Sequence, residues 1–188
     1  MWTDEGVALI RQRIDELLSR QGRVLVAIDG KCASGKTTLA ARLAECYDCN
    51  VFHMDDFFLR PEQRTEERYA QAGGNVDYER FGAEVLEPLK GGAPFSYRPF
   101  DCKTLTLSAP VCVVPKPLSI IEGSYSMHPV FGQPYDLTVL LTVTPELQKE
   151  RILLRPGHLH NQFFTRWIPM ENRYLEEFRI EQRADLIC

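Results

Sequence analysis

Short apolar runs, rather than alternating ones, give this chain its strongest pattern. Residues 24–28 are rich in Val and Ile and lie between Gly22 and Gly30, as expected for a strand buried on both faces. Similar runs recur later in the chain. Because runs of this kind are typical of parallel sheets, we expect a central parallel sheet. The predicted strands cover residues 24–28, 50–53, 118–123, 137–143 and 185–187.

Between these runs, apolar residues recur at helical spacing. Residues 2–20 place Val7, Ile10 and Ile14 on one face, which predicts an amphipathic helix that packs on the sheet and ends at Gly22. Together with the predicted strands, these segments indicate an α/β fold. The other predicted helices follow the glycine-containing loop near residue 35 and cover residues 77–87 (closed by Pro88 and then Gly91-Gly92), 145–153, 161–167 and 169–178.

Residues 94–117 have a different character. Phe95, Tyr97 and Phe100 alternate with polar residues and prolines, and two short runs then flank Ser108-Ala109-Pro110. This pattern predicts two or three short antiparallel strands. Such a hairpin could cover a substrate pocket, or it could be an edge ribbon with an apolar underside.

Composition and charge narrow the classes of function. The 188 residues are enough for one domain with a sizeable core, so we expect a single domain over residues 1–188. A net charge of −4 argues against a nucleic-acid scaffold. No apolar run approaches the roughly 20 residues of a membrane helix, and the N-terminus lacks a signal pattern. We therefore expect a cytoplasmic protein with no membrane or nucleic-acid partner, and a homo-oligomer remains open.

The six cysteines do not form a convincing disulfide or zinc pattern. Cys46 and Cys49 form a CxxC pair, but no second pair of Cys or His follows at zinc-finger spacing. We expect reduced thiols, several of them buried.

A phosphate-binding motif lies between the first predicted strand and the helix that follows it. Gly30 and Gly35 can adopt backbone angles that let the chain wrap around a phosphate, and Gly35 leads directly to Lys36 and Thr37. The helix start adds unpaired N–H groups, Lys36 adds a mobile positive charge, and the Thr37 hydroxyl is a hard ligand for Mg²⁺. The sequence therefore predicts a nucleoside triphosphate site. Its residues are Gly30, Lys31, Cys32, Ala33, Ser34, Gly35, Lys36, Thr37 and Thr38.

Acidic residues follow two other predicted strands. Asp55 and Asp56 come just after residues 50–53, and Glu122 ends the run at 118–123. Ligands of open parallel sheets bind at the carboxyl ends of the strands. A carboxylate there can accept a proton from an attacking hydroxyl or hold Mg²⁺, although solvated or helix-capping acids would give the same pattern.

Arginines form a second group of candidates. Arg60, Arg64 and Arg68 lie in a charged stretch that is either a solvated face or a clamp for an anionic acceptor. Arg151 and Arg155 lie one helical turn apart and could face the same way.

The order of these features resembles the uridine kinase-like family of P-loop kinases, which includes nicotinamide riboside kinase, bacterial pantothenate kinase and phosphoribulokinase relatives. Asp55-Asp56-Phe57-Phe58 resembles the family's Asp-x-Phe-[Tyr/Phe] motif, which implies that Asp55 is the catalytic base. Asn75-Val76-Asp77-Tyr78 resembles the stretch whose Asp holds ribose hydroxyls, which implies that role for Asp77. Glu122-Gly123 resembles the end of the Walker B-like strand, which implies a magnesium role for Glu122.

The resemblance extends to the rest of the chain. Arg151 and Arg155 resemble arginines that lead into the lid and contact phosphates, and residues 184–187 resemble the family's closing strand. It implies a P-loop three-layer sandwich, with a small β-hairpin substrate subdomain at about 94–117 and a short lid at about 155–166. Two departures stand out. Phe100-Asp101 is followed by Cys102 to Leu105, without the histidine and arginine that help uridine kinases read the base, and the lid carries few cations.

We therefore expect an ATP- and Mg²⁺-dependent kinase that phosphorylates a hydroxyl of a small molecule, foremost a nucleoside. Thr37, Glu122 and Asp55 would hold the metal, and Lys36, Arg151 and Arg155 would stabilise the transferred phosphoryl group. A non-nucleoside acceptor, such as a vitamin precursor or sugar phosphate, and a regulatory nucleotide-dependent switch are the alternatives. The residues expected to contact the acceptor are Asp56, Arg60, Asp77, Tyr97 and Phe100.

Overall fold

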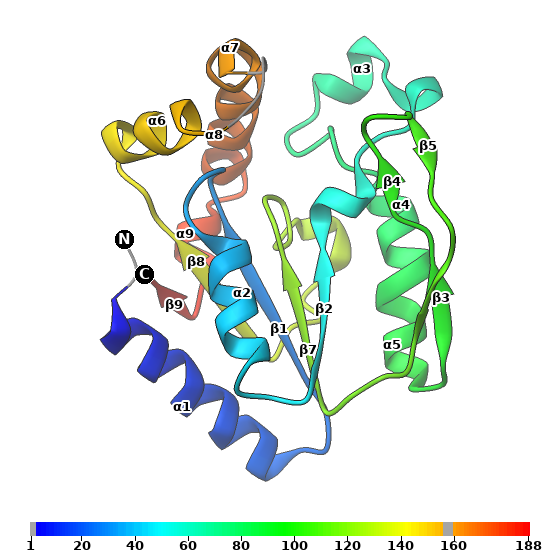
Figure 1. Ribbon diagram of the computed structural model, residues 1–188, viewed down its shortest axis with the longest axis vertical. Helices are drawn as coiled ribbons and strands as arrows, with labels where there is room; N and C mark the ends of the chain where they lie inside the picture. The colour runs from blue at the N-terminus through cyan, green and yellow to red at the C-terminus, as the bar shows by residue number, and fades with distance from the viewer. Residues whose placement is uncertain (1–2, 156–159) are drawn as a thin grey trace.

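A five-stranded parallel sheet forms the centre of the computed structural model, which describes residues 3–155 and 160–188 (Figure 1). The strand order is β2-β7-β1-β8-β9, and every neighbouring pair is parallel. The predicted α/β fold with a central parallel sheet is confirmed. The strands are β1 (Val24–Gly30), β2 (Cys49–His53), β7 (Leu118–Glu122), β8 (Leu137–Leu141) and β9 (Leu186–Ile187).

The register of the sheet brings the ends of three strands together. β1 lies between β7 and β8, and Ile28 of β1 is opposite both Glu122 and Val139. His53 of β2 is opposite Glu122 on the other side of β7. The polar residues that end β2 and β7 and the loop that follows β1 therefore share one edge of the sheet, as the sequence predicts.

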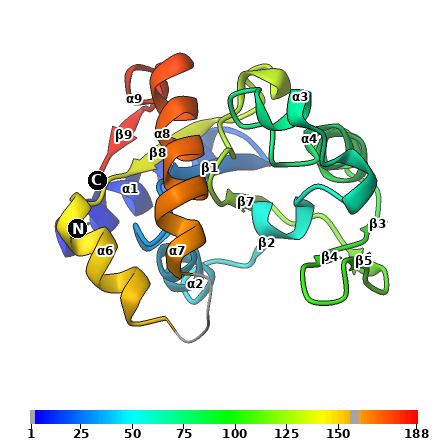
Figure 2. The same ribbon diagram turned by 90° about the horizontal axis from the view of Figure 1, so that it is seen from above.

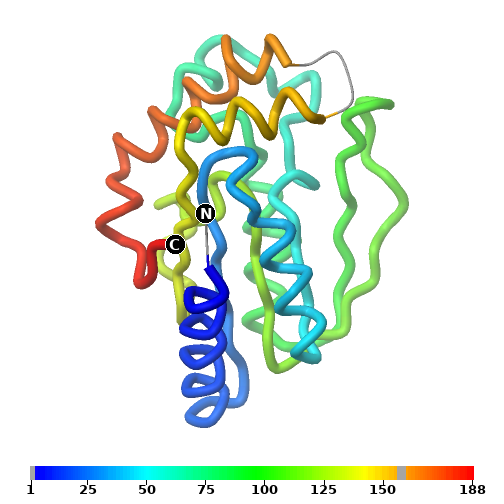
Figure 3. The backbone as a smooth tube through the Cα atoms, turned by 60° about the vertical axis from the view of Figure 1, so that its left-hand side comes forward, coloured from blue at the N-terminus to red at the C-terminus, as the bar shows by residue number. Residues whose placement is uncertain are grey.

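Two helices cover one face of the sheet. Ile10 and Ile14 of α1 (Asp4–Arg20) and Leu39 and Leu43 of α2 (Lys36–Ala44) are fully buried in a cluster with side chains of the central strands. Figures 1 and 3 show both helices on the same side of the sheet. The amphipathic helix predicted at 2–20 is confirmed, because its predicted apolar face is the face that packs against the sheet.

The other face carries the third layer, which Figure 2 shows from above. Its core contains Phe52, Phe81 and Tyr174, all almost completely buried. The helical elements of this layer and its loops are η1 (Met54–Phe57), η2 (Pro61–Gln63), α3 (Glu66–Tyr69), α4 (Tyr78–Phe81), η3 (Gly82–Leu86), α5 (Glu87–Gly91), η4 (Pro129–Phe131), η5 (Phe163–Trp167), α8 (Ile168–Glu177) and α9 (Ile180–Arg183).

The hairpin region contains four very short strands. They pair as two antiparallel ladders, β3 with β6 and β4 with β5, where two or three strands were expected. The antiparallel prediction is confirmed. The strands are β3 (Phe95–Tyr97), β4 (Phe100–Asp101), β5 (Thr106–Leu107) and β6 (Val111–Val113).

Two prolines do not end the helices in which they lie. Pro88 and then Gly91-Gly92 were expected to close a helix. α4, η3 and α5 run through Pro88 without a break and end at Gly91, with Gly92 as the C-cap, so the glycines close it and the proline does not. Pro169 likewise lies inside the continuous run from α7 (His160–Gln162) through η5 to α8. In both places a π-type turn precedes the proline, and its wider backbone accommodates a residue that has no N–H to donate.

The remaining helix, α6 (Pro145–Leu153), begins at the capping residue Thr144. The lid expected at 155–166 includes residues 156–159, which lie outside the described residues. None of the helices in the described part of the chain is long and apolar enough to cross a membrane.

Candidate active site

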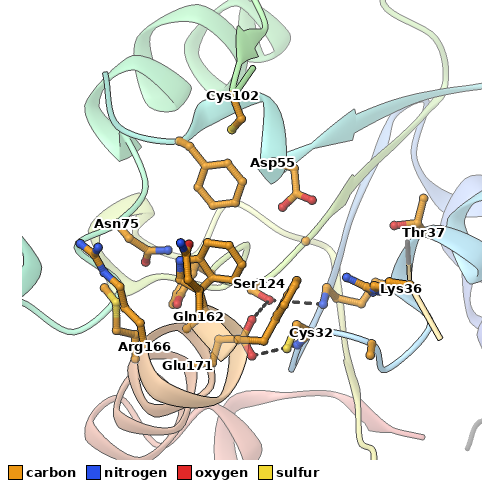
Figure 4. A pocket seen from close by; sticks show the side chains of 18 of the residues that line it. Cys32, Lys36, Thr37, Asp55, Asn75, Cys102, Ser124, Gln162, Arg166 and Glu171 are labelled. Carbon is orange, nitrogen blue, oxygen red and sulfur yellow. Dashed lines mark hydrogen bonds between the residues drawn. The ribbon is translucent and has the colours of Figure 1, made fainter. Parts of the chain in front are cut away.

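A cavity of about 960 Å³ opens at the carboxyl ends of β1, β2 and β7. Its walls come from the phosphate loop, the segments that follow β2 and β7, the tip of the hairpin, and the helices α6 to α8. Figure 4 shows Lys36 and Thr37 toward one end of this cavity and Asn75 and Arg166 toward the other. The two ends of the cavity therefore present different side chains, so they can bind different chemical groups.

The phosphate loop has the backbone that the motif predicts. Gly30 has a φ of 142°, and a Cβ there would collide with the Leu141 carbonyl, so only glycine fits. Gly35 has a φ of 101° and immediately precedes α2, whose first residue is Lys36. The first N–H groups of α2 and the positive end of its dipole therefore point at the cavity.

Hydrogen bonds to the loop backbone hold the Lys36 side chain in place. Its Nζ donates to the carbonyl oxygens of Gly30 and Lys31, at 2.8 and 2.9 Å, and lies 3.3 Å from the Ser124 hydroxyl. All three partners are neutral, so a phosphate that enters the loop offers the ammonium group a stronger, charged partner.

Thr37, Glu122 and His53 form a second group beside the loop. The Thr37 hydroxyl donates to Glu122 Oε1 at 3.0 Å, and His53 Nδ1 lies 2.5 Å from the same oxygen. The hydrogen bond with Glu122 raises the pKa of His53, against the effect of partial burial. His53 was not predicted, although its place at the end of β2 is the signal that identified Asp55.

Asp55 lies in η1 just after β2 and is exposed to the cavity. The surrounding walls desolvate its carboxyl group and raise its pKa, while the charge of Lys36 acts in the opposite direction. A carboxylate with a raised pKa is a stronger base than an ordinary aspartate. The predicted base is therefore brought to the same cavity as the phosphate loop.

Glu171 of α8 is a site residue that the sequence did not reveal. Its carboxylate is buried, accepts from the Cys32 N–H at 2.9 Å and accepts from the Ser124 hydroxyl at 2.8 Å. Burial, followed by the charge of Glu171, raises the pKa of the Cys32 thiol to about 12. Ser124 follows Glu122-Gly123 at a strand end and was detectable, but nothing local marks a glutamate in a helix.

The two arginines predicted at the lid lie beside the loop. Arg151 of α6 donates to the Ala33 carbonyl at 2.7 Å, and Arg155 stacks 5.5 Å from the Phe163 ring. Both line the cavity. Arg151 is therefore held directly against the phosphate loop.

The five residues expected to contact the acceptor do not line the cavity. Tyr97 and Phe100 are buried, and the Tyr97 ring stacks on Phe57 in the aromatic core under the hairpin. The Tyr97 hydroxyl points at Asp56, 3.3 Å away. The structure therefore does not bring these two aromatic residues to the cavity, because the hairpin turns its aromatic side toward the core.

Asp77 and Arg60 are used within the protein. Asp77 caps α4 by accepting from the Arg80 N–H, and its Oδ2 lies 3.5 Å from Arg80 Nε and 3.6 Å from Arg60 Nε. Its side chain is only 2% exposed. The residue expected to hold ribose hydroxyls is thus paired with two arginines instead.

Of the three arginines at 60, 64 and 68, only Arg64 lines the cavity. Arg68 forms a bidentate ion pair with Glu79 and stacks on the Tyr78 ring, so its role is structural. The far end of the cavity also carries three residues that were not predicted: Asn75, Tyr125 and Arg166. Asn75 lies in the stretch from which only Asp77 was chosen.

The cysteines form neither a disulfide nor a cluster of metal ligands in the part of the chain that the structure describes. All six are free, and no group of three or more His, Cys, Asp or Glu in residues 3–155 and 160–188 has the geometry of a metal site. The expectation that several are buried is wrong. Cys32, Cys49 and Cys188 are half-buried, and Cys46, Cys102 and Cys112 are exposed.

Comparison with known proteins places the chain among kinase structures. It is similar to the structure of a possible uridine kinase from Bacillus stearothermophilus, with 26% identity, a TM-score of 0.70, and coverage of 95% of this chain and 98% of the other. It is also similar to a candidate fructose transport system kinase from Silicibacter sp. TM1040, with 26% identity, a TM-score of 0.67, and coverage of 97% and 98%. No family model and no curated protein matches the sequence.

The fold matches that of P-loop kinases, and this fold implies nucleotide binding. The two structures are described as kinases of small molecules, which suggests a phosphotransferase.

Proposed function

We propose that this chain is an ATP-dependent phosphotransferase that moves the γ-phosphoryl group to a hydroxyl of a small molecule. The observation that carries this proposal is the position of Asp55, a carboxylate that faces one cavity together with Lys36 and Thr37 of the phosphate loop. A switch or regulatory ATPase would not need a catalytic base facing space for an acceptor beside the phosphate loop.

In the proposed reaction Asp55 accepts the proton of the acceptor hydroxyl. The hydroxyl oxygen forms a bond to the γ-phosphorus, the bond from phosphorus to the β–γ bridging oxygen breaks, and ADP leaves. Lys36, Arg151 and Arg155 stabilise the negative charge on the transferred group. The aromatic side chains of Phe163 and Trp167, which line the cavity, help to keep water from taking the place of the acceptor.

The residues present fit a magnesium ion. The Thr37 hydroxyl and the Glu122 carboxylate are hard oxygen ligands that lie 3.0 Å apart, and Asp55 lines the same cavity. Thr37 and Glu122 would hold the ion, with Asp55 in reach through water. When bound, Mg²⁺ would neutralise charge on the nucleotide phosphates.

A nucleoside is one candidate acceptor, and its support is the 26% identity to a possible uridine kinase. The cavity itself favours a non-nucleoside acceptor. Asp77, Tyr97 and Phe100, the residues expected to orient a nucleoside, do not line it, which supports a different acceptor.

The test is Asp55→Asn, assayed by ADP release with Mg²⁺-ATP and a panel of hydroxyl acceptors. The panel contains uridine, cytidine, nicotinamide riboside, pantothenate and ribose 5-phosphate. Loss of the base should lower the acceptor-dependent kcat by about 10²- to 10⁴-fold.

Asp56→Asn is the matched control. Asp56 carries the same group one residue later but is directed at Tyr97, so its loss should change kcat only a few-fold. Acceptor-independent ADP release that Asp55→Asn leaves unchanged would overturn the proposed reaction.

A further inference from the structure

The far end of the cavity contains buried polar atoms with no partner. Asn75 Oδ1 has no hydrogen-bond partner within the described residues, and the Tyr125 hydroxyl, which lies beside the Asn75 side chain, makes no hydrogen bond of good geometry there. Tyr125 is 2% exposed and Asn75 is 9% exposed, and both line the cavity. Leaving such atoms unsatisfied is costly, so their position indicates a ligand with hydroxyl groups.

The backbone at Tyr125 gives a second sign of a built site. Its φ is 75°, a left-handed conformation that is unfavourable for a bulky aromatic residue. The Tyr125 N–H donates to the buried Asp29 at 3.2 Å, which helps to hold this conformation. Strained residues of this kind cluster at binding sites.

Two arginines with no acidic partner reach the same cavity. Arg64 Nε donates to the Leu59 carbonyl at 3.0 Å, so the bond fixes the guanidinium and leaves its two terminal nitrogens available. Arg166 stacks 4.3 Å from the Tyr69 ring, which also lines the cavity. Neither arginine forms an ion pair within 4.0 Å in residues 3–155 and 160–188.

The position of Arg166 separates it from the phosphate loop. Figure 4 shows Arg166 beside Asn75, on the side of the cavity away from Lys36 and Thr37, with Asp55 between them in this view. The loop end already has its own cations in Lys36, Arg151 and Arg155. A positive charge at the far end therefore points to an anion on the acceptor rather than on the nucleotide.

We propose that the acceptor is a small hydroxylated compound that carries an anionic group, a carboxylate or a phosphate. Arg64 and Arg166 bind the anion, and Asn75 and Tyr125 bind a hydroxyl. This arrangement directs another hydroxyl toward Asp55. The inference rests on the proposed phosphotransfer and specifies its substrate class.

The first experiment compares related acceptors with and without an anionic group. Pantothenate is paired with panthenol, and ribose 5-phosphate and ribonate are each paired with ribose, in the ADP-release assay. We expect turnover with at least one anionic member and at least a tenfold lower kcat/KM with its neutral partner. The carboxylate and phosphate pairs show which anion the site prefers.

The second experiment measures binding without turnover. A non-hydrolysable ATP analogue with Mg²⁺ fills the phosphate loop, and calorimetry then follows the binding of pantothenate, ribonate and ribose 5-phosphate. We expect Arg64→Gln and Arg166→Gln to weaken binding of an anion by about ten- to a hundredfold, the factor for one charge-assisted hydrogen bond. Arg20→Gln, at the end of α1 and outside the cavity, should leave this affinity unchanged.

The outcomes separate this inference from the proposed function. Acceptor-dependent turnover with uridine, ribose or panthenol but with no anionic compound would overturn the anionic acceptor and leave the kinase in place. Anion binding that both arginine variants leave unchanged, or no anion binding to the wild type, would also overturn it. Anion binding that the variants weaken, without any turnover, would support the site and count against phosphotransfer.

Discussion

At the scale of single residues, the buried Asp29 is the centre of a hydrogen-bond network behind the cavity. Its two carboxylate oxygens accept four hydrogen bonds, from the N–H groups of Gly30, Tyr125 and Met127 and from the Tyr174 hydroxyl. These donors belong to the phosphate loop, to the segment after β7 and to α8. One buried side chain thus joins three parts of the site.

Asp29→Asn should therefore be strongly destabilising, although the two side chains are nearly the same size. The new amide NH₂ replaces an oxygen that accepts two of these hydrogen bonds, so donors face donors in a buried place. We expect a loss of about 2 kcal/mol or more in the free energy of unfolding, measured by urea denaturation. Asp136→Asn is the control, because Asp136 is exposed and accepts one N–H, from Leu25. Equal losses in both variants would contradict the assigned role of Asp29.

The same scale shows which site residues a sequence can reveal. Lys36, Thr37, Asp55 and Glu122 are placed by local chain geometry, at a loop or a strand end, and the structure brings all four to one cavity. Tyr97 depends instead on which side of the hairpin faces the core. That choice is made by packing against distant residues, so no local pattern contains it.

At the scale of elements, α8 ties two walls of the cavity together. Arg173 of α8 donates through Nη2 to the carbonyl oxygens of Tyr69 and Gln71, at 3.0 and 2.5 Å. These two residues belong to the segment that also carries Arg64, far from α8 in the sequence. Arg173 therefore links α8 to the segment that forms part of the far end of the cavity.

Arg173→Met should loosen that segment. The substitution keeps much of the side-chain length but removes both hydrogen bonds, so residues 61–72 should open more often. We expect faster amide hydrogen exchange there, with protection in β1 unchanged, measured by mass spectrometry. Arg20→Met, at the exposed end of α1, controls for the loss of a charge. Unchanged exchange in 61–72 would show that other contacts hold the segment.

Element boundaries were less predictable than the elements themselves. The apolar runs predicted the strands because burial on both faces leaves an uninterrupted signature. Pro88 was expected to help close one helix and Pro169 to begin another, but each follows a π-type turn inside a continuous helix. A π-type turn depends on the packing around it and leaves little trace in the local sequence.

At the scale of the whole molecule, stability and chemistry lie in different places. Two apolar clusters occupy the two faces of the sheet, and the cavity lies at the carboxyl edge of its strands. α1 contributes only to the cluster on its own face and does not line the cavity. Changes in α1 should therefore affect folding without affecting binding.

Ile10→Ala tests this separation. Ile10 is fully buried, and its truncation leaves a void between α1 and the sheet, which should cost about 2–5 kcal/mol of unfolding free energy. Leu9→Ala, one residue away and 44% exposed, should change it by no more than about 0.5 kcal/mol. Both variants should keep the wild-type affinity for nucleotide below their unfolding temperatures. A large loss of affinity in Ile10→Ala would mean that α1 is coupled to the site.

The hydrogen bond from Cys32 to Glu171 has a consequence for the order of events. A phosphate oxygen that accepts from the Cys32 N–H replaces the Glu171 carboxylate and frees a buried charge on α8. The same continuous helical run carries Arg166 at the other end of the cavity. Binding of the nucleotide at one end would then change the affinity for the acceptor at the other end. By thermodynamic linkage, the acceptor would change the affinity for the nucleotide by the same factor. The two substrates would bind with synergy or antagonism rather than independently, as a shift of each dissociation constant with the concentration of the other ligand would reveal.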